Sequence, residues 1–155
     1  MAGDRKWRGV YLEREFILSR AFRELRTATA YVVLMIFMTK RVMTKCHTSK
    51  RGGWIVANNG EIQFTYGEAR EKWGISDDRF SRALDELIEK GFIDVAEPGI
   101  GVHKLATLYS ISERWKDYGT DRFVKRERHR GPINHGFKKG NRLGRNCRRA
   151  ESTVI

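Results

Sequence analysis

The chain has 155 residues, a length that fits one domain with an appendage, and its 31 Lys and Arg against 19 Asp and Glu give a formal net charge of +12. Hydrophobic residues make up 40% of the chain, which is enough for a core and excludes a wholly disordered protein. Cys46 and Cys147 form no CxxC pair, which disfavours a disulfide scaffold and a cysteine-based zinc site and fits a reducing compartment.

The longest apolar run of the chain extends from Ala30 to Met38. A helix needs about 20 apolar residues to cross a bilayer, so this run predicts a buried helix and no membrane association. The first ten residues, MAGDRKWRGV, are polar and lack the pattern of a secretory signal. We therefore expect a cytoplasmic protein.

The N-terminal third of the chain reads as an extension followed by two helices and a loop. Residues 1–18 have a mixed pattern and are expected to be an N-terminal extension without an assigned function. Residues 19–45 predict two helical pieces, the second of which begins near Thr27 or Thr29 and is apolar on almost all sides. Residues 46–60 are rich in Gly and Asn and predict a loop.

Sharper signals begin after this loop. Residues 61–64 alternate polar and apolar side chains, as a short strand does. Thr65 and Glu68 form a capping box, in which the Thr hydroxyl accepts from the third backbone N–H and the Glu carboxylate reaches back. The helix that this box opens is expected to end at Gly74, because glycine tolerates the left-handed conformation of a helix end.

A second helix and a hairpin follow directly. Ser76 is the expected N-cap of a helix over 77–90, whose apolar residues fall on one face. Two helices joined by about three residues are a helix-turn-helix. Strands over 92–95 and 104–111 predict a hairpin, and a last short helix is expected over 113–118.

The positive charge is concentrated at the C-terminal end of the chain. Residues 121–155 carry eleven Lys and Arg against three acids, or +8, whereas residues 1–120 carry 20 bases and 16 acids, or +4. Glycines interrupt the segment and little of it is apolar, which predicts a basic, largely irregular arm that neutralises phosphates. A solubilising tail without a specific partner is the alternative. The arm residues expected to contact nucleic acid are Arg122, Lys125, Arg126, Arg128, Arg130, Lys138, Lys139, Arg142, Arg145, Arg148 and Arg149.

Gly60–Ser112 resembles the winged helix-turn-helix superfamily, and it is similar in particular to the winged helices of phage and plasmid replication initiators and small bacterial regulators. The resemblance is carried by the turn Gly74-Ile75-Ser76 and by Glu89-Lys90-Gly91-Phe92-Ile93 before the hairpin. With the helix over 27–43 taken as the usual first helix, it spans residues 27–112. It implies nucleic-acid binding, with DNA favoured over RNA.

The resemblance also implies that helix 77–90 lies in a major groove with its N-terminal half against base edges. Arg79 or Arg82 would then make the bidentate hydrogen bonds to guanine that arginine geometry favours. The same helix carries five acids against three bases, so ion pairs of Arg82 with Asp78 or Glu86 are the alternative. The other candidate contacts from the helices and the wing are Arg70, Lys72, Ser81, His103 and Lys104.

These observations predict an α+β protein with a winged-helix domain over 19–120 that orients nucleic acid and an arm over 121–155 that supplies backbone affinity. The expected process is phage or plasmid replication or transcription regulation. The alternative is a subunit of a larger nucleoprotein complex, whose winged helix contacts a protein partner or a second copy and whose arm holds RNA or DNA. We find no catalytic constellation, cofactor motif or metal-ligand spacing among the side chains, and Cys46-His47 reads as a surface pair.

Overall fold

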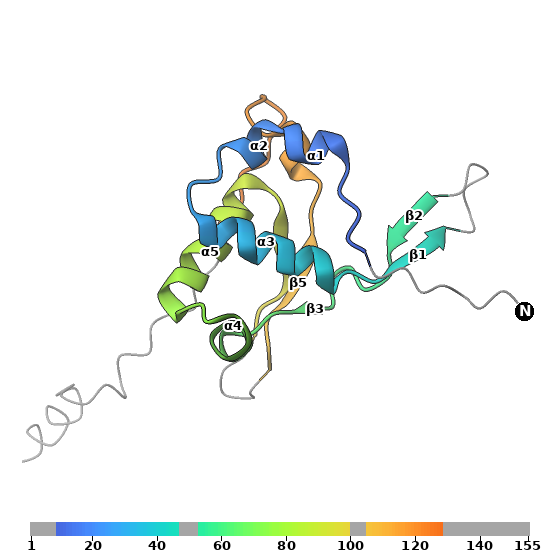
Figure 1. Ribbon diagram of the computed structural model, residues 1–155. Coiled ribbons are helices and arrows are strands. Elements are labelled where there is room, and N and C mark those ends of the chain that lie inside the picture. Colours follow the sequence, from blue (N-terminus) through green and yellow to red (C-terminus); the bar gives the residue numbers. More distant parts are fainter. Residues whose placement is uncertain (1–8, 47–52, 100–104, 129–155) are drawn as a thin grey trace, which may run out of the picture.

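The computed structural model describes residues 9–46, 53–99 and 105–128 of the chain. Helices and small antiparallel sheets alternate along these ranges (Figure 1), which confirms the predicted α+β class. The elements are α1 (Arg14–Leu18), α2 (Arg20–Arg23), α3 (Ala28–Lys40), β1 (Met43–Cys46), β2 (Gly53–Val56), β3 (Ile62–Gln63), α4 (Tyr66–Trp73), α5 (Asp77–Lys90), β4 (Ile93–Glu97), β5 (Leu108–Ile111) and the 3-10 helix η2 (Arg114–Asp117).

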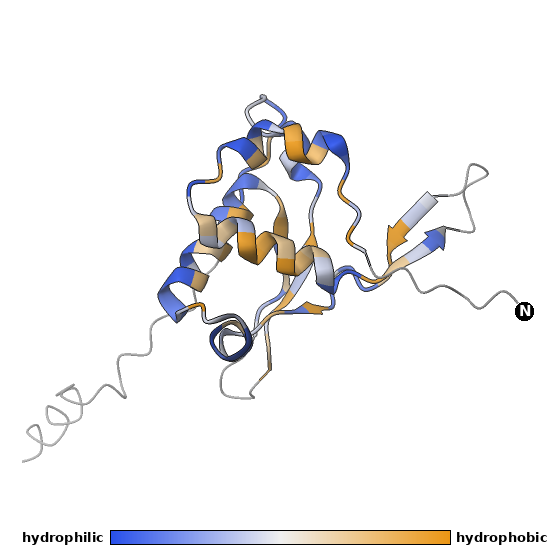
Figure 2. Cartoon of the chain, viewed as in Figure 1, coloured by the Kyte–Doolittle hydropathy of each residue, from blue (hydrophilic) through white to orange (hydrophobic). Residues whose placement is uncertain are grey.

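Helix α3 is the centre of the core, as its apolar pattern predicted. It begins after Thr27, whose side-chain oxygen accepts a hydrogen bond from the Ala30 N–H at 3.2 Å. Val33, Leu34 and Phe37 of this helix are fully buried. Figure 1 shows α3 crossing the middle of the body, and Figure 2 shows apolar residues along it. Most sides of this helix are buried, which suits its apolar composition, although Val32 on its outward side is 46% exposed.

Helices α4 and α5 confirm the predicted pair and its three-residue connection. The Thr65 side-chain oxygen accepts from the Glu68 N–H at 3.1 Å, so half of the capping box forms. The other half does not, because the Glu68 carboxylate instead binds the Lys40 ammonium group at 2.8 Å. Gly74 ends α4 at φ +63°, and the Ser76 side chain makes no capping hydrogen bond to α5, contrary to its predicted role.

The second sheet has the strand order β3-β5-β4, and all its neighbours are antiparallel. Ile62 lies opposite Tyr109, and Ile93 lies opposite Ile111. All three strands were predicted, although β3 and β5 are shorter than expected and begin at Ile62 and Leu108. The Tyr109 ring packs on Phe37 of α3 with ring centres 5.3 Å apart, so this sheet closes the core from one side.

The structure corrects the prediction for the segment between α3 and β3. The helix ends at Lys40, short of the expected residue 45. An antiparallel hairpin takes the place of the predicted helix end, through β1, and of part of the loop predicted over 46–60, through β2. Asn58 explains the change, because its side chain accepts from the Val42 N–H at 2.9 Å and donates to the Lys40 carbonyl at 3.0 Å. In Figure 1 the hairpin projects away from the helices.

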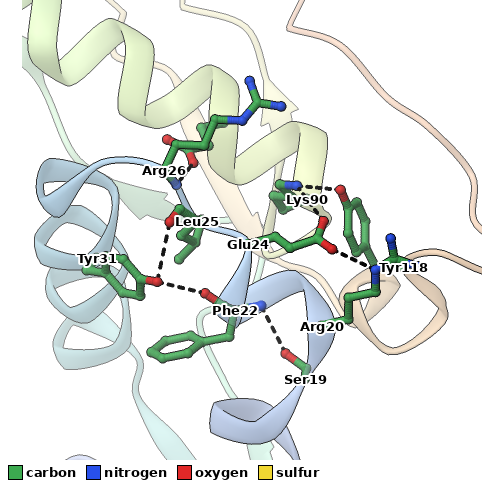
Figure 3. A network of polar contacts seen from close by, with 10 residues as sticks. Ser19, Arg20, Phe22, Glu24, Leu25, Arg26, Tyr31, Lys90 and Tyr118 are labelled. Carbon is green, nitrogen blue, oxygen red and sulfur yellow. Dashed lines mark hydrogen bonds and ion pairs between the residues drawn. The ribbon is translucent and has the colours of Figure 1, made fainter.

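Residues near both ends of the described chain pack on the same part of the core. The buried Phe16 ring of α1 lies 5.2 Å from the Phe92 ring and 5.1 Å from the Trp115 ring, between ring centres. Nearby, the buried Lys90 ammonium group lies 3.4 Å from the Glu24 carboxylate and donates to the Tyr118 hydroxyl (Figure 3). These contacts join α1, α2, the end of α5 and η2.

Candidate nucleic-acid interface

The candidate interface is the outward face of α5 together with the segment that follows η2. One face of α5 is fully buried through Phe80, Leu84 and Leu87. Helical spacing therefore directs Arg82 outward, where it is exposed and makes no hydrogen bond or ion pair with any residue in the described ranges. Within those ranges, the expected alternative of Arg82 ion pairs with Asp78 or Glu86 does not occur.

Glu86 is unavailable to Arg82 because its carboxylate turns into the protein. It accepts hydrogen bonds from the Arg26 N–H and from the Thr27 hydroxyl, the latter at 3.1 Å. The carboxylate therefore holds the residue that caps α3, and it is a buried part of the joint between α3 and α5.

Two further acids of α5 are engaged in ion pairs. The Asp77 carboxylate lies 3.1 Å from the Arg70 guanidinium across the connection between α4 and α5, and both side chains are exposed. The Asp85 carboxylate lies 2.9 Å from the Nε atom of Arg128. Three of the five acids on α5 therefore interact with partners outside the helix, which offsets their repulsion toward phosphates.

Arg79 is held against the start of α3. Its Nε and Nη2 atoms donate to the Thr29 hydroxyl at 3.2 and 3.0 Å. Thr29 is buried, whereas Arg79 is exposed as a whole, so the arginine lies at the edge of the surface that carries Arg82. The two arginines expected to read bases thus differ in their surroundings: one is anchored within the protein and the other is not.

Residues 120–128 fold back along α5. Arg128 ends this segment, and its side chain is only 12% exposed. Its guanidinium donates to the Ser81 hydroxyl at 2.6 Å and to the Tyr66 hydroxyl at 3.0 Å. Burial opposes its charge, but the contacts with Tyr66 and Asp85 raise the pKa of Arg128 above its ordinary value, so the cation persists.

The segment and α5 form the walls of a half-open cavity of about 340 Å³. It is lined by Asp85, Glu89, Lys125, Arg126, Glu127 and Arg128. Acids of α5 and bases of the segment therefore face each other across this space. Sequence reasoning missed the juxtaposition, because no local pattern connects residue 128 with residues 81 and 85.

Of the other predicted contact residues, those that the structure describes are exposed, and three of them also lie close to an acidic side chain. Lys72 is exposed, 3.6 Å from the Glu68 carboxylate, and Arg122 is also exposed. Arg126 lies 3.4 Å from the buried Asp94 carboxylate, and Lys125 lies 3.2 Å from Glu127. The remaining ones lie outside the described residues: His103, Lys104, Arg130, Lys138, Lys139, Arg142, Arg145, Arg148 and Arg149.

In the described part of the chain, no three His, Cys, Asp or Glu side chains are grouped so that they could hold a metal ion. None of the helices in those ranges has the length and apolarity that a bilayer span requires. Comparison with protein-family models, with curated proteins and with solved structures found no match.

Proposed function

We propose that the chain is a DNA-binding protein whose domain is a winged helix, with α5 as the recognition helix and the C-terminal arm as the main source of affinity. The domain assignment is supported by the order α3, β3, α4, α5, β4, β5 and by the sheet order β3-β5-β4. The resemblance of Gly60–Ser112 to winged helices of phage and plasmid initiators supports replication or transcription control as the process.

One observation carries the proposal: Arg82 extends from α5 without an internal partner among the described residues, while three acids of that helix are engaged elsewhere. An exposed arginine on a helix where two acids are ion-paired and a third is buried suits recognition of guanine in a major groove. The excess of bases over acids in residues 121–155 suits contacts to the phosphate backbone, which lose affinity as salt rises.

Truncation of the arm tests the source of affinity. Removal of residues 129–155 deletes seven Lys and Arg but keeps the packed segment before it. Each phosphate contact contributes about 0.9 to the slope of log affinity against log salt concentration, so the slope should fall by up to about 6. Fluorescence anisotropy with duplex DNA at several salt concentrations measures it. An unchanged slope would remove the arm from the proposal.

Arg82→Ala tests the role of α5. We expect it to relax sequence preference and to cost about 1–3 kcal/mol on the preferred site, measured by selection from a randomised DNA pool followed by titration. Arg23→Ala is the matched control, because it removes an exposed arginine of α2 that lies outside the candidate interface. Equal sequence preference in the wild type and Arg82→Ala would count against base recognition by this residue.

A protein-assembly function is the second candidate, and the β1–β2 hairpin favours it. Trp54 is 63% exposed on this hairpin, and Val42 and Ile55 beside it are also exposed. Exposed apolar side chains on a projecting hairpin suit contact with a protein partner or a second copy. Light scattering over a concentration series tests self-association, and Trp54→Ser should abolish any dimer that uses this surface.

A further inference from the structure

The segment 120–128 is attached to α5 along its course, not only at its origin. At the C-terminal end of α5, the Arg114 guanidinium donates to the Ile88 carbonyl at 2.9 Å and to the Val124 carbonyl at 2.7 Å. It also binds the Asp94 carboxylate, which Arg126 approaches to 3.4 Å. The segment then passes toward the N-terminal half of α5.

Its last described residue, Arg128, is bound by three groups there. The Tyr66 hydroxyl belongs to the first turn of α4, and the Ser81 hydroxyl and the Asp85 carboxylate lie one turn apart on α5. The Tyr66 ring in turn packs on the buried Phe80 with ring centres 5.0 Å apart, which holds the hydroxyl in place. A largely buried cation with three polar partners is costly to release, because each partner would lose a charge-assisted contact.

We propose that Arg128 is a positioning residue that attaches the start of the basic arm to α4 and α5, so that the arm and α5 contact the same stretch of DNA. We call its contacts with Tyr66, Ser81 and Asp85 the latch. This inference rests on the proposed function. Arg128 is the last described residue, so its contacts with Ser81 and Asp85 fix the point beside α5 at which the described chain ends. Binding of the arm then follows binding of α5 at a high effective concentration.

Release of the latch would free the chain after Val124, which Arg114 still holds, as a tether of about four residues whose end-to-end distance as a flexible coil is roughly 11 Å. The arm would keep its charges but lose its fixed origin. Affinity for a short duplex should therefore fall, whereas the slope of affinity against salt should change little, because the number of phosphate contacts stays the same.

Asp85→Asn tests the latch, because the latch and simple electrostatics predict changes of opposite sign in DNA affinity. The substitution removes an acid, which by charge alone tightens DNA binding, whereas loss of the latch weakens it. We expect affinity for a short duplex to fall about 3- to 10-fold. Glu89→Gln is the matched control, because this acid lies one turn further on, lines the same cavity, and has no ion pair within the described ranges. It should bind as tightly as the wild type or more tightly.

A second readout needs no DNA. In the free protein, trypsin should cleave after Lys125 and Arg126 several-fold faster in Asp85→Asn and in Arg128→Gln than in Glu89→Gln, with cleavage at each bond followed by mass spectrometry. Thermal melts confirm that all variants are folded.

Equal cleavage rates in Asp85→Asn and Glu89→Gln would overturn the latch, as would equal or tighter DNA binding by Asp85→Asn. Faster cleavage in a protein whose wild type binds no DNA would instead refute the proposed function and leave Arg128 as the attachment of the segment.

Discussion

Glu86 lies on the recognition helix of the proposed DNA-binding domain, yet its carboxylate serves the core. From the helical spacing it was expected to flank the exposed face of α5. In the fold it is buried and accepts hydrogen bonds from the Arg26 N–H and the Thr27 hydroxyl. Because both donors lie at the start of α3, this one side chain connects two helices and supports the cap of the central one.

Substitution of Glu86 should therefore be costly to stability. We expect Glu86→Ala to lower the free energy of unfolding by about 1–3 kcal/mol, because it removes the buried acceptor of two hydrogen bonds that join α5 to the start of α3. Glu89→Ala on the same helix should change it by less than about 0.5 kcal/mol, since that half-buried side chain makes no hydrogen bond or ion pair within the described ranges. Urea denaturation of both variants measures the difference. Equal losses would mean that the Glu86 contacts contribute little.

At the scale of elements, two glycines end α4 and α5 in the left-handed conformation. Gly74 ends α4 at φ +63°, and Gly91 ends α5 at φ +84°. Their surroundings differ. A Cβ atom at Gly74 would meet nothing within 4 Å, whereas one at Gly91 would lie 2.8 Å from the Arg114 Cβ atom and 2.9 Å from the Trp115 backbone nitrogen. Gly91 therefore also allows η2 to approach the end of α5.

This difference predicts unequal effects of alanine. Gly74→Ala should cost about 1–2 kcal/mol of stability, which is the conformational penalty of a left-handed residue with a side chain. Gly91→Ala should cost that amount plus about 1–3 kcal/mol for the clash with η2. Thermal and chemical denaturation of the two variants test the order. A smaller loss at Gly91 than at Gly74 would contradict the close packing of η2 on α5.

At the scale of the whole molecule, one polar network joins segments from both ends of the described chain. The Glu24 carboxylate lies between Arg20, Lys90 and Tyr118 in Figure 3. The Arg20 hydrogen bond, at 2.7 Å, is the main cause that lowers the pKa of Glu24 from 4.5 to about 2, and Tyr118 and Lys90 add to it. The ionised carboxylate thus helps to hold α2, α5 and the residue after η2 together.

The lowered pKa fixes the sign of a pH effect. The ionised Glu24 contributes its full stabilisation above pH 4.5, which is the pKa of an unperturbed carboxyl group. This contribution is lost as the pH falls toward 2, the pKa of Glu24 in the folded protein. The wild type should therefore exceed Glu24→Gln in stability at pH 5, and the gap should narrow steadily between pH 4.5 and 2. Denaturation midpoints at half-unit pH steps measure it. A gap that stays constant over this window would show that the network does not depend on ionised Glu24.

The helices of the domain were predictable because their signals are local. Caps, terminal glycines and apolar spacing lie within a few residues of one another, so the start of α3 could be narrowed to Thr27 or Thr29, and Gly74 could be assigned as the end of α4. The β1–β2 hairpin was not predictable, because the contact at its base pairs Asn58 with Lys40 and Val42 across 16 to 18 residues. No local rule anticipates a side chain that ends a helix from such a distance.

The same division applies to charge. The sequence by itself determined that the arm carries most of the net charge and that α5 has more acids than bases. Only the tertiary structure decided which of those charges stay exposed: Glu86 and Asp85 are engaged by Thr27 and Arg128, and Arg82 is left with no described partner. The physical reason is that helix formation depends on neighbours along the chain, whereas an ion pair depends on which distant segments packing brings within about 4 Å.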